Sequence, residues 1–438
     1  MNVEIVALIV LVAVFAISAI RNVHMGALAF VAALMVGVLL VGEPLDDVLG
    51  GFPVDALLIL LGITYLFGIA RTVGAVDWLV DRSVRLIGDR VALIPWAMWI
   101  VGTLVACLGT SHAAFTIVPI AMSLAHKHRI HSTMMGIVMS SAIVGGALAP
   151  TSIVGITVMT VANTAEIAYN PALMFGLSVG VNAVVVLAAF LMFGGRGLIA
   201  RGRAARKDAI DGGSLGNGGG TAVKTEVQTE APKLTGYGVL TLIAIPVLVV
   251  LFFTLTLNDV DLNLGAVALT LAVLLAFIKP KVGKEALGKV DWNTILLLGG
   301  IITYVGVLTR LGAIDQLGEF ARSVDEPLIA AFVMCVIAAL VSAFASTIGI
   351  IGALVPLAVP LLIPGGGLEM TGFIYALAIS ASLVDCAPFG TTGATIVAST
   401  HEDDRQMVYR HLTIWGLTMV VVGPVITLAL FVVPFLWA

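Results

Sequence analysis

The chain carries the stretch Ala149-Pro150-Thr151-Ser152-Ile153-Val154-Gly155-Ile156-Thr157 and, later, a second version of it, Ala387-Pro388-Phe389-Gly390-Thr391-Thr392-Gly393-Ala394-Thr395. The Ala-Pro pair, the glycine and the last threonine occupy the same places in both versions. Each version puts a proline, which breaks helices, inside a long apolar segment. An apolar chain whose two halves each carry such an interruption is typical of a transporter built from internal repeats.

Two further matches relate the halves. Gly74-Ala75-Val76-Asp77 returns as Gly312-Ala313-Ile314-Asp315 in the same register. Gly26-Ala27-Leu28-Ala29 matches Gly265-Ala266-Val267-Ala268 after a shift of one position. The similarity between the halves therefore extends beyond the two proline stretches.

The composition indicates a membrane protein. The chain has 438 residues, of which 60% are hydrophobic and 11% charged, whereas a soluble chain carries roughly 25% charged residues. The apolar segments are continuous and do not alternate with polar residues, which excludes a closed β-barrel. The sequence therefore predicts an all-α polytopic membrane protein.

The apolar segments divide into single passes and two longer stretches. The stretches 92–126 and 327–363 are too long for one pass, which needs about 20 residues, and each contains small polar residues in its middle. We interpret both as re-entrant hairpins. The expected single passes are 3–20, 25–41, 54–73, 134–163, 171–194, 236–257, 263–279, 293–310, 371–399 and 408–436.

The positive charges predict the orientation. With this arrangement, all but two of the 22 Lys and Arg residues fall on one side, and only Arg310 and Arg322 fall on the other. The positive-inside rule makes the crowded side cytoplasmic. We therefore expect the N-terminus and the C-terminus outside and the central linker in the cytoplasm.

Each half then has five passes and one hairpin, and because five is odd the two halves are inverted relative to each other. The first repeat is 1–195, with the hairpin 92–126 opening from the cytoplasm and the broken helix 134–163. A flexible cytoplasmic linker, 196–233, follows. The second repeat is 234–438, with the hairpin 327–363 opening from outside and the broken helix 371–399. A lipid-contacting role for the basic stretch 196–207 is an alternative to a simple positive-inside signal.

Polar groups gather at the two hairpin tips and the two broken helices, where backbone amides and carbonyls at membrane depth must line a cavity or lie within protein. The amides and hydroxyls there suit an anion, and the carbonyls suit a small cation. The hydroxyl-rich and ionisable positions are Thr110, Ser111, His112, Thr151, Ser152, Thr157, Ser346, Thr347, Asp385, Thr391, Thr392 and Thr395.

Plainer interpretations stay open for each of these residues. Ser, Thr and Gly in membrane helices often serve close packing only, and Pro150 and Pro388 could be kinks. Asp385 could bind a cation or carry a proton, or it could pair with a neighbouring hydroxyl. His112 could contact an anion or pack at the hairpin tip.

The residues of both broken helices resemble a known family. Met134–Met139, Gly145–Gly155, Asp385–Ala394 and Val408-Tyr409-Arg410 look like blocks of the bacterial malonate/dicarboxylate carriers of the MatC type. The order of hairpin, broken helix, hairpin and broken helix also resembles the divalent anion:sodium symporter family within the ion transporter superfamily. The resemblance covers nearly the whole chain apart from the linker, and the two proline blocks are its most specific parts.

The resemblance implies a homodimer with a scaffold domain and a moving transport domain, working by an elevator motion, and a dicarboxylate site flanked by two sodium sites. Better-studied members carry Ser-Asn-Thr at each hairpin tip, where this chain has Gly109-Thr110-Ser111 and Ser346-Thr347-Ile348. The expected substrate-binding residues are Ser111, His112, Thr151, Ser152, Thr347, Thr391 and Thr392. The expected cation-binding residues are Gly109, Thr110, Ala149, Pro150, Gly155, Ser346, Asp385, Ala387 and Pro388.

The function expected from the sequence is secondary active transport of a small organic anion, such as malonate, succinate or malate, coupled to Na⁺ or H⁺. Alternatives are an anion uniporter or channel, or a carrier of citrate, sulfate or an aromatic acid. We expect no enzyme activity, because no metal set, nucleophile–base pair or soluble catalytic domain stands out. We also expect no cofactor, no transition metal and no nucleic acid partner, and a location in the bacterial inner membrane.

Overall fold

The computed structural model describes residues 3–21, 23–76, 78, 82, 91–107, 113–165, 167–201, 234–257, 263–313, 327–344, 347–362 and 370–433. Within these ranges every regular element is a helix. The first half contains α1 (Val3–Arg21), α2 (Met25–Leu34), the π-helix η1 (Met35–Val41), α3 (Leu45–Gly50), α4 (Val54–Thr72), η2 (Val91–Leu93), α6 (Ile94–Cys107), α7 (Ala113–Lys127), α8 (Ser132–Ala147), α9 (Ile153–Thr164) and α10 (Pro171–Met192). The second half contains α12 (Gly236–Leu257), α13 (Leu264–Ile278), α14 (Pro280–Leu287), α15 (Trp292–Arg310), α17 (Pro327–Phe344), α18 (Thr347–Leu362), α19 (Met370–Leu383), η4 (Val384–Cys386), α20 (Thr391–Ser399) and α21 (Glu402–Phe431).

The helices suit a bilayer. Five segments in the described part of the chain are long and apolar enough to cross a membrane, namely Val54–Thr72, Pro171–Met192, Trp292–Arg310, Met370–Ser399 and Glu402–Phe431. Shorter apolar helices accompany them. Large apolar side chains such as Val12, Val184 and Phe277 point outward and are mostly exposed, which suits lipid contact. The chain is an integral, multi-pass membrane protein.

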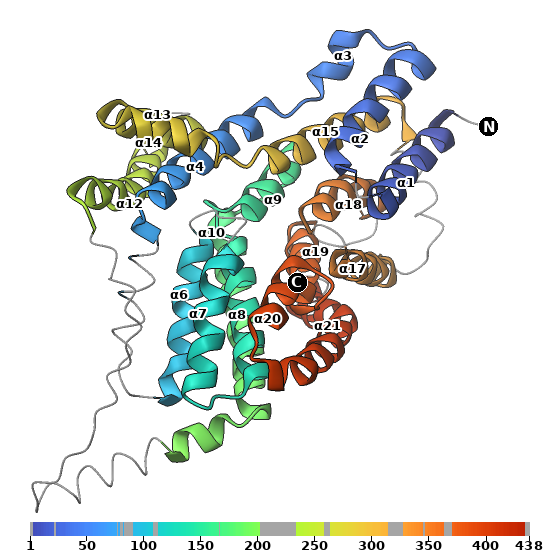
Figure 1. The fold of residues 1–438 in the computed structure, drawn as a ribbon. Helices are drawn as coiled ribbons and strands as arrows, with labels where there is room; N and C mark the ends of the chain where they lie inside the picture. The colour runs from blue at the N-terminus through green and yellow to red at the C-terminus, as the bar shows by residue number, and fades with distance from the viewer. Residues whose placement is uncertain are drawn as a thin grey trace, which may run out of the picture.

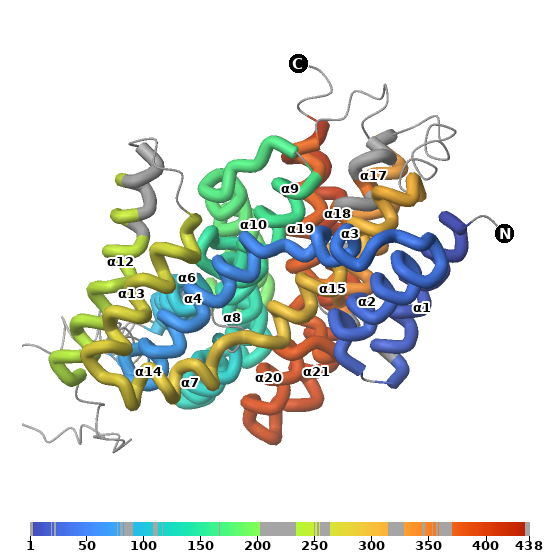
Figure 2. Tube along the Cα trace, turned by 90° about the horizontal axis from the view of Figure 1, so that it is seen from above, coloured from blue at the N-terminus to red at the C-terminus, as the bar shows by residue number. Residues whose placement is uncertain are grey.

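Helices of each half pack against helices of the other half. The first-half helix α2 packs along the second-half helix α15, and the second-half helix α13 packs along the first-half helix α4. In Figure 1 and Figure 2, α12, α13 and α14 accompany α4 at one end of the molecule, while α1, α2 and α3 accompany α15 at the other. The remaining helices, α6 to α10 and α17 to α21, lie between and beneath these two groups.

Glycines allow both of these contacts. Gly26 of α2 lies against Gly300 of α15, and a Cβ atom on either residue would overlap the facing backbone. Gly265 of α13 and Gly62 of α4 make the same kind of contact. Small residues at a crossing let two membrane helices approach closely. The same glycine-on-glycine contact therefore occurs twice, with the halves exchanged.

The hairpins and the broken helices also pack across the two halves. Helix α7, the second arm of the first hairpin, packs on α20 of the second half. Helix α18, the second arm of the second hairpin, packs on α9 of the first half. The two interrupted helices touch as well, because α8 packs on η4 and α19 packs on both α8 and α9.

Several hydrogen bonds join loops that are far apart in the sequence, and they can be grouped by the two sides that the charges predict. The loops on the basic side are joined by His24 Nε2 to the Asn293 carbonyl at 3.1 Å, Arg71 to the Lys289 carbonyl at 3.4 Å, Arg201 to the Arg129 carbonyl at 3.0 Å and Ser132 to Asp404 at 2.6 Å. The loops on the other side are joined by Arg310 to Glu43 at 2.9 Å, Asn263 to the Asp55 carbonyl at 3.3 Å and Thr371 to the Ala168 carbonyl at 2.9 Å.

One helix in each half ends in the same way. Gly74 follows α4 with φ of +70°, and Gly312 follows α15 with φ of +76°. Both values lie in the left-handed region that glycine adopts without a Cβ clash, and such a residue commonly terminates a helix. The matched Gly-Ala pairs of the sequence therefore end equivalent helices.

Some bounds differ from the prediction. The last helix, α21, begins at Glu402 instead of 408, because three acidic residues, Glu402, Asp403 and Asp404, fill its first turn and interact favourably with the positive end of the helix dipole. The pass expected at 25–41 changes from an α-helix to a π-helix at Met35. The short helices α3 and α14 were not expected from hydropathy alone.

Candidate functional site

The first interruption separates α8, which ends at Ala147, from α9, which begins at Ile153. Pro150 lies between them. The Ala149 amide donates to the Gly146 carbonyl at 3.1 Å, and the Ser152 amide donates to the Ala149 carbonyl at 2.9 Å. The helix then resumes, with the Ile156 amide bonded to the Ser152 carbonyl at 2.9 Å.

The second interruption has the same bonds at the equivalent positions. The Ala387 amide donates to the Val384 carbonyl at 2.9 Å, and the Gly390 amide donates to the Ala387 carbonyl at 3.1 Å. The helix resumes with the Ala394 amide bonded to the Gly390 carbonyl at 3.0 Å. The two proline stretches therefore fold into one and the same backbone turn, although the residues after each proline differ.

A glycine closes each turn. A Cβ atom on Gly155 would overlap the Ala149 carbonyl, and a Cβ atom on Gly393 would overlap the Ala387 carbonyl. The first turn of each resumed helix thus rests directly on the carbonyl before the proline. Any other residue at these two positions would push the resumed helix away from that carbonyl.

The two resumed helices begin without a side-chain cap. Ser152 and Gly390 are the N-cap residues of α9 and α20, and neither helix has a side-chain hydrogen bond at its cap. The leading amides of a helix are unsatisfied within the helix and carry a partial positive charge. An anion placed at the start of either helix would receive hydrogen bonds without any Lys or Arg.

Thr151 ties the first interruption to the first hairpin. Its hydroxyl donates to the Cys107 carbonyl at 2.6 Å. Cys107 is the last residue of α6, the first arm of the hairpin. The turn around Pro150 and the end of the hairpin arm are therefore held together by a side chain.

Asp385 ties the second interruption to the second hairpin. The Thr347 hydroxyl, at the start of α18, lies 3.1 Å from Asp385 Oδ1. The Ser342 hydroxyl of α17 lies 2.7 Å from the Thr347 hydroxyl. One arm of the hairpin thus contacts the Asp385 carboxyl group through Thr347, and the other arm contacts Thr347 through Ser342.

The other hydroxyls differ in their partners. Ser152 is buried and donates to the Ala147 carbonyl at the end of α8, so its hydroxyl caps that helix. Thr157 donates to the Ile153 carbonyl at 2.9 Å, and Thr395 donates to the Thr391 carbonyl at 2.7 Å. Each of these two hydroxyls bonds to a backbone carbonyl one turn earlier in its own helix. Thr391 is exposed at the start of α20, and Thr392 beside it is buried.

The predicted residues Gly109, Thr110, Ser111, His112 and Ser346 lie outside the described residues. The structure brings together Ala149, Pro150, Thr151, Ser152 and Gly155 in the first turn, and Asp385, Ala387, Pro388, Thr391 and Thr392 in the second, with Thr347 beside Asp385. Within the described ranges, no set of three His, Cys, Asp or Glu side chains is arranged to hold a metal ion.

Sequence reasoning missed three participants. Gly393 was noticed as the repeat match of Gly155 but was not assigned to the site. Ser342 gives no signal, since it is one polar residue within an apolar helix. The Cys107 carbonyl gives none either, because a backbone partner does not depend on residue type.

One family of known proteins matches the N-terminal part of the chain. Residues 1–147 match the family described as "Dicarboxylate carrier protein MatC N-terminus". The match is confined to this N-terminal part of the chain and ends at Ala147, the last residue of α8. The resemblance to MatC-type carriers noted from the sequence is thereby confirmed.

Two transporters are similar to this chain. An uncharacterized transporter of Methanocaldococcus jannaschii is 28% identical over 140 residues, which cover 31% of this chain and 32% of that protein. The matched region thus spans about a third of the relative's length. Among solved structures, the YdaH transporter of Alcanivorax borkumensis overlays with a TM-score of 0.48 and 14% identity, covering 87% of this chain and 86% of that one. Over part of its length, the chain is therefore similar to the MatC-type dicarboxylate carriers and to an uncharacterized transporter.

Proposed function

We propose that this protein is a transporter that carries a small organic anion, a C3–C4 dicarboxylate such as malonate, succinate or malate, by secondary active transport coupled to Na⁺ or H⁺. The observation that carries the proposal is the pair of identical backbone turns, each bonded to its own hairpin arm. Interrupted helices of this kind form the substrate and ion sites of many secondary transporters.

The two halves are inverted repeats related by a pseudo-two-fold axis. The exchanged contacts of α2 with α15 and α13 with α4, and of α7 with α20 and α18 with α9, support this relation, because a two-fold axis exchanges each contact for its partner. The repeats cover 1–195 and 234–438. The basic loops face the cytoplasm, so both termini lie outside.

The anion lies at the starts of α9 and α20. There it receives hydrogen bonds from the leading amides and from the hydroxyls of Thr391 and Thr392. A co-transported cation lies nearby, held by the carbonyls of Ala149 and Ala387, each of which has one lone pair left after its turn hydrogen bond. Asp385 supplies a carboxylate for Na⁺ or takes up the H⁺.

The moving part consists of the hairpins and interrupted helices with α10 and α21, and α1 to α4 with α12 to α15 form the scaffold of a homodimer. The scaffold meets the moving part where α4 packs on α9 and α15 packs on α18. Both contacts involve elements next to the proposed site, because α9 follows the first interruption and α18 is the second arm of the second hairpin. Loading the site fixes these arms, and the loaded domain then moves across the membrane in an elevator motion.

A thermal-shift screen of the purified protein tests the proposal. Malonate, succinate, malate, citrate, sulfate and a monocarboxylate are compared with and without Na⁺ and at two pH values. A ligand that binds only the native state raises the melting temperature. A C3–C4 dicarboxylate should stabilise the protein most, and more so with its coupling ion. A screen in which none of the dicarboxylates shifts the melting temperature would contradict the proposal.

A further inference from the structure

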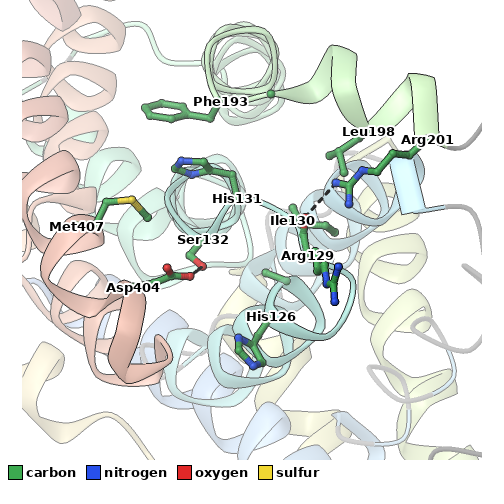
Figure 3. A pocket seen from close by; sticks show the side chains of 12 residues that line it. His126, Arg129, Ile130, His131, Ser132, Phe193, Leu198, Arg201, Asp404 and Met407 are labelled. Carbon is green, nitrogen blue, oxygen red and sulfur yellow. Dashed lines mark hydrogen bonds between the residues drawn. The ribbon is translucent and has the colours of Figure 1, made fainter. Parts of the chain in front are cut away.

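A cavity of about 750 Å³ opens at the basic end of the helices, away from both interruptions. It lies between the α7–α8 loop, the chain that follows α10, and the start of α21 (Figure 3). Its polar walls come from His126, Arg129, His131, Ser132, Arg201 and Asp404. A volume of this size suits a small ligand or a lipid headgroup.

Arg129 occupies a position that favours glycine. Its φ is +50°, in the left-handed region, and no other non-glycine residue in the described ranges has a positive φ. The Arg129 amide donates to the His126 carbonyl at 3.2 Å, and the Ile130 amide donates to the Ala125 carbonyl at 2.8 Å. These two bonds define a Schellman motif, whose left-handed residue is usually glycine. An arginine there costs stability, which indicates that its side chain has a use.

Arg201 brings a second guanidinium group to the same wall. Residues 195–201 are helical, with Leu198 buried against the protein. Arg201 Nη2 donates to the Arg129 carbonyl at 3.0 Å, and Figure 3 shows the two arginine side chains on one wall. In the part of the chain that the structure describes, the ion pairs involve neither guanidinium.

The opposite wall does not neutralise this charge directly. The Asp404 carboxylate accepts a hydrogen bond of 2.6 Å from Ser132. His131 lies beside it, with its Nδ1 buried and without a partner among the described residues. Burial lowers the pKa of His131, and the neighbouring His411 lowers it further while Asp404 raises it. His126 stacks on His401, with the ring centroids 4.1 Å apart.

We propose that this cavity binds a phosphate group, held between the guanidinium groups of Arg129 and Arg201. The guanidinium group of an arginine can donate two parallel, charge-assisted hydrogen bonds to phosphate oxygens. Basic pockets between helices on the cytoplasmic side are also where anionic headgroups bind. The phosphate belongs either to an anionic phospholipid or to a soluble phosphate. The site is separate from the proposed transport site and does not depend on it.

Three variants test the assignment. Arg129→Gly removes the guanidinium and gives the left-handed position its preferred residue, so the fold is retained. Arg201→Ala removes the second guanidinium. Arg196→Ala is the matched control, because Arg196 is an exposed cation on the same short helix but does not line the cavity.

Two probes separate the sources of phosphate. Inorganic phosphate is titrated against the full-length protein in detergent, and nanodiscs of phosphatidylglycerol are compared with nanodiscs of phosphatidylcholine, with melting temperature as the readout. The probe that binds should stabilise the wild type and the Arg196→Ala variant alike. Its affinity should fall by about tenfold or more in Arg129→Gly and in Arg201→Ala.

Stabilisation by inorganic phosphate identifies a soluble ligand, and stabilisation by phosphatidylglycerol alone identifies a headgroup. Either result, together with the loss in both cavity variants, supports the site. The proposal is overturned if neither probe stabilises the wild type. It is also overturned if Arg129→Gly responds to the effective probe as the wild type does, or if Arg196→Ala loses the response equally.

Discussion

The Thr347 hydroxyl of the second hairpin lies 3.1 Å from the Asp385 carboxylate, at the turn that interrupts the second broken helix. Ser342 completes a short chain of polar groups through its contact with Thr347. A carboxyl group among apolar helices needs such partners, because an isolated charge there is expensive. The Asp385 carboxyl group is therefore bonded to the second hairpin through Thr347.

Replacing Asp385 with Asn should change the ion dependence of transport. Asn keeps the shape and the hydrogen bond from Thr347 but removes the negative charge that would hold Na⁺ or take up H⁺. The measurement is initial uptake into proteoliposomes as a function of Na⁺ concentration and of pH. Identical curves for wild type and Asp385→Asn would remove Asp385 from ion coupling. Thr347→Ser, which keeps the hydroxyl, is the control and should behave as wild type.

Thr151→Val should both destabilise the protein and reduce transport. The substitution removes the 2.6 Å bond to the Cys107 carbonyl and leaves that carbonyl without its donor, at a loss of about 1–3 kcal/mol. The hairpin arm is then no longer held to the first turn. Melting temperature and uptake rate are the two readouts.

Thr157→Val is the matched control for Thr151→Val. The Thr157 hydroxyl bonds only the Ile153 carbonyl of its own helix, so its loss should leave uptake nearly unchanged. If both variants transport equally well, the bond between Thr151 and the hairpin has no role in transport.

Gly155→Ala and Gly393→Ala should each be strongly harmful. The added Cβ atom would overlap the Ala149 or the Ala387 carbonyl, and such overpacking costs about 1–3 kcal/mol. Gly176→Ala and Gly180→Ala on α10 are controls, because nothing lies within 4 Å of a Cβ atom at either position. A helix-interior Gly→Ala change should stabilise α10 slightly. Folded, fully active Gly155→Ala and Gly393→Ala variants would show that the turns do not need their glycines.

The repeated sequence was sufficient to locate both interruptions. Each proline removes an amide and prevents the helix from continuing, and each glycine that follows admits a close backbone contact. These are local effects, so one sequence reveals them. The helix pairs α2–α15 and α4–α13 could not be derived in the same way, because an apolar helix with glycines fits several neighbours equally well.

The two interruptions were predictable in their location, but the hydrogen bonds around them were not. Thr151, Thr157 and Thr395 look alike in the sequence, yet the first reaches the neighbouring hairpin and the other two bond their own helices. Hydropathy cannot separate these cases, because the difference depends on which side of the helix faces a partner. The cavity with Arg129 and Arg201 was hidden for the same reason, since its walls come from distant parts of the chain.

Stability should fall at acidic pH because of His131. Its pKa in the folded protein lies below the usual 6.5, mainly through burial, so the unfolded chain takes up a proton first as the pH falls. Stability is then lost as the pH falls through about 6.5 towards the lowered pKa of the folded state. His131→Phe keeps an aromatic ring near Phe193 and should flatten the pH dependence of the melting temperature. An equally steep curve in the variant would assign the dependence to other groups.

Uptake of labelled malonate, succinate and malate into proteoliposomes, under an imposed Na⁺ gradient and separately under an imposed H⁺ gradient, tests the central claim most directly. The account predicts that at least one dicarboxylate accumulates under one of the two gradients, and that Thr391→Val reduces this accumulation while Thr395→Val does not. Equal uptake with and without both gradients, or no uptake of any dicarboxylate by folded protein, would contradict it.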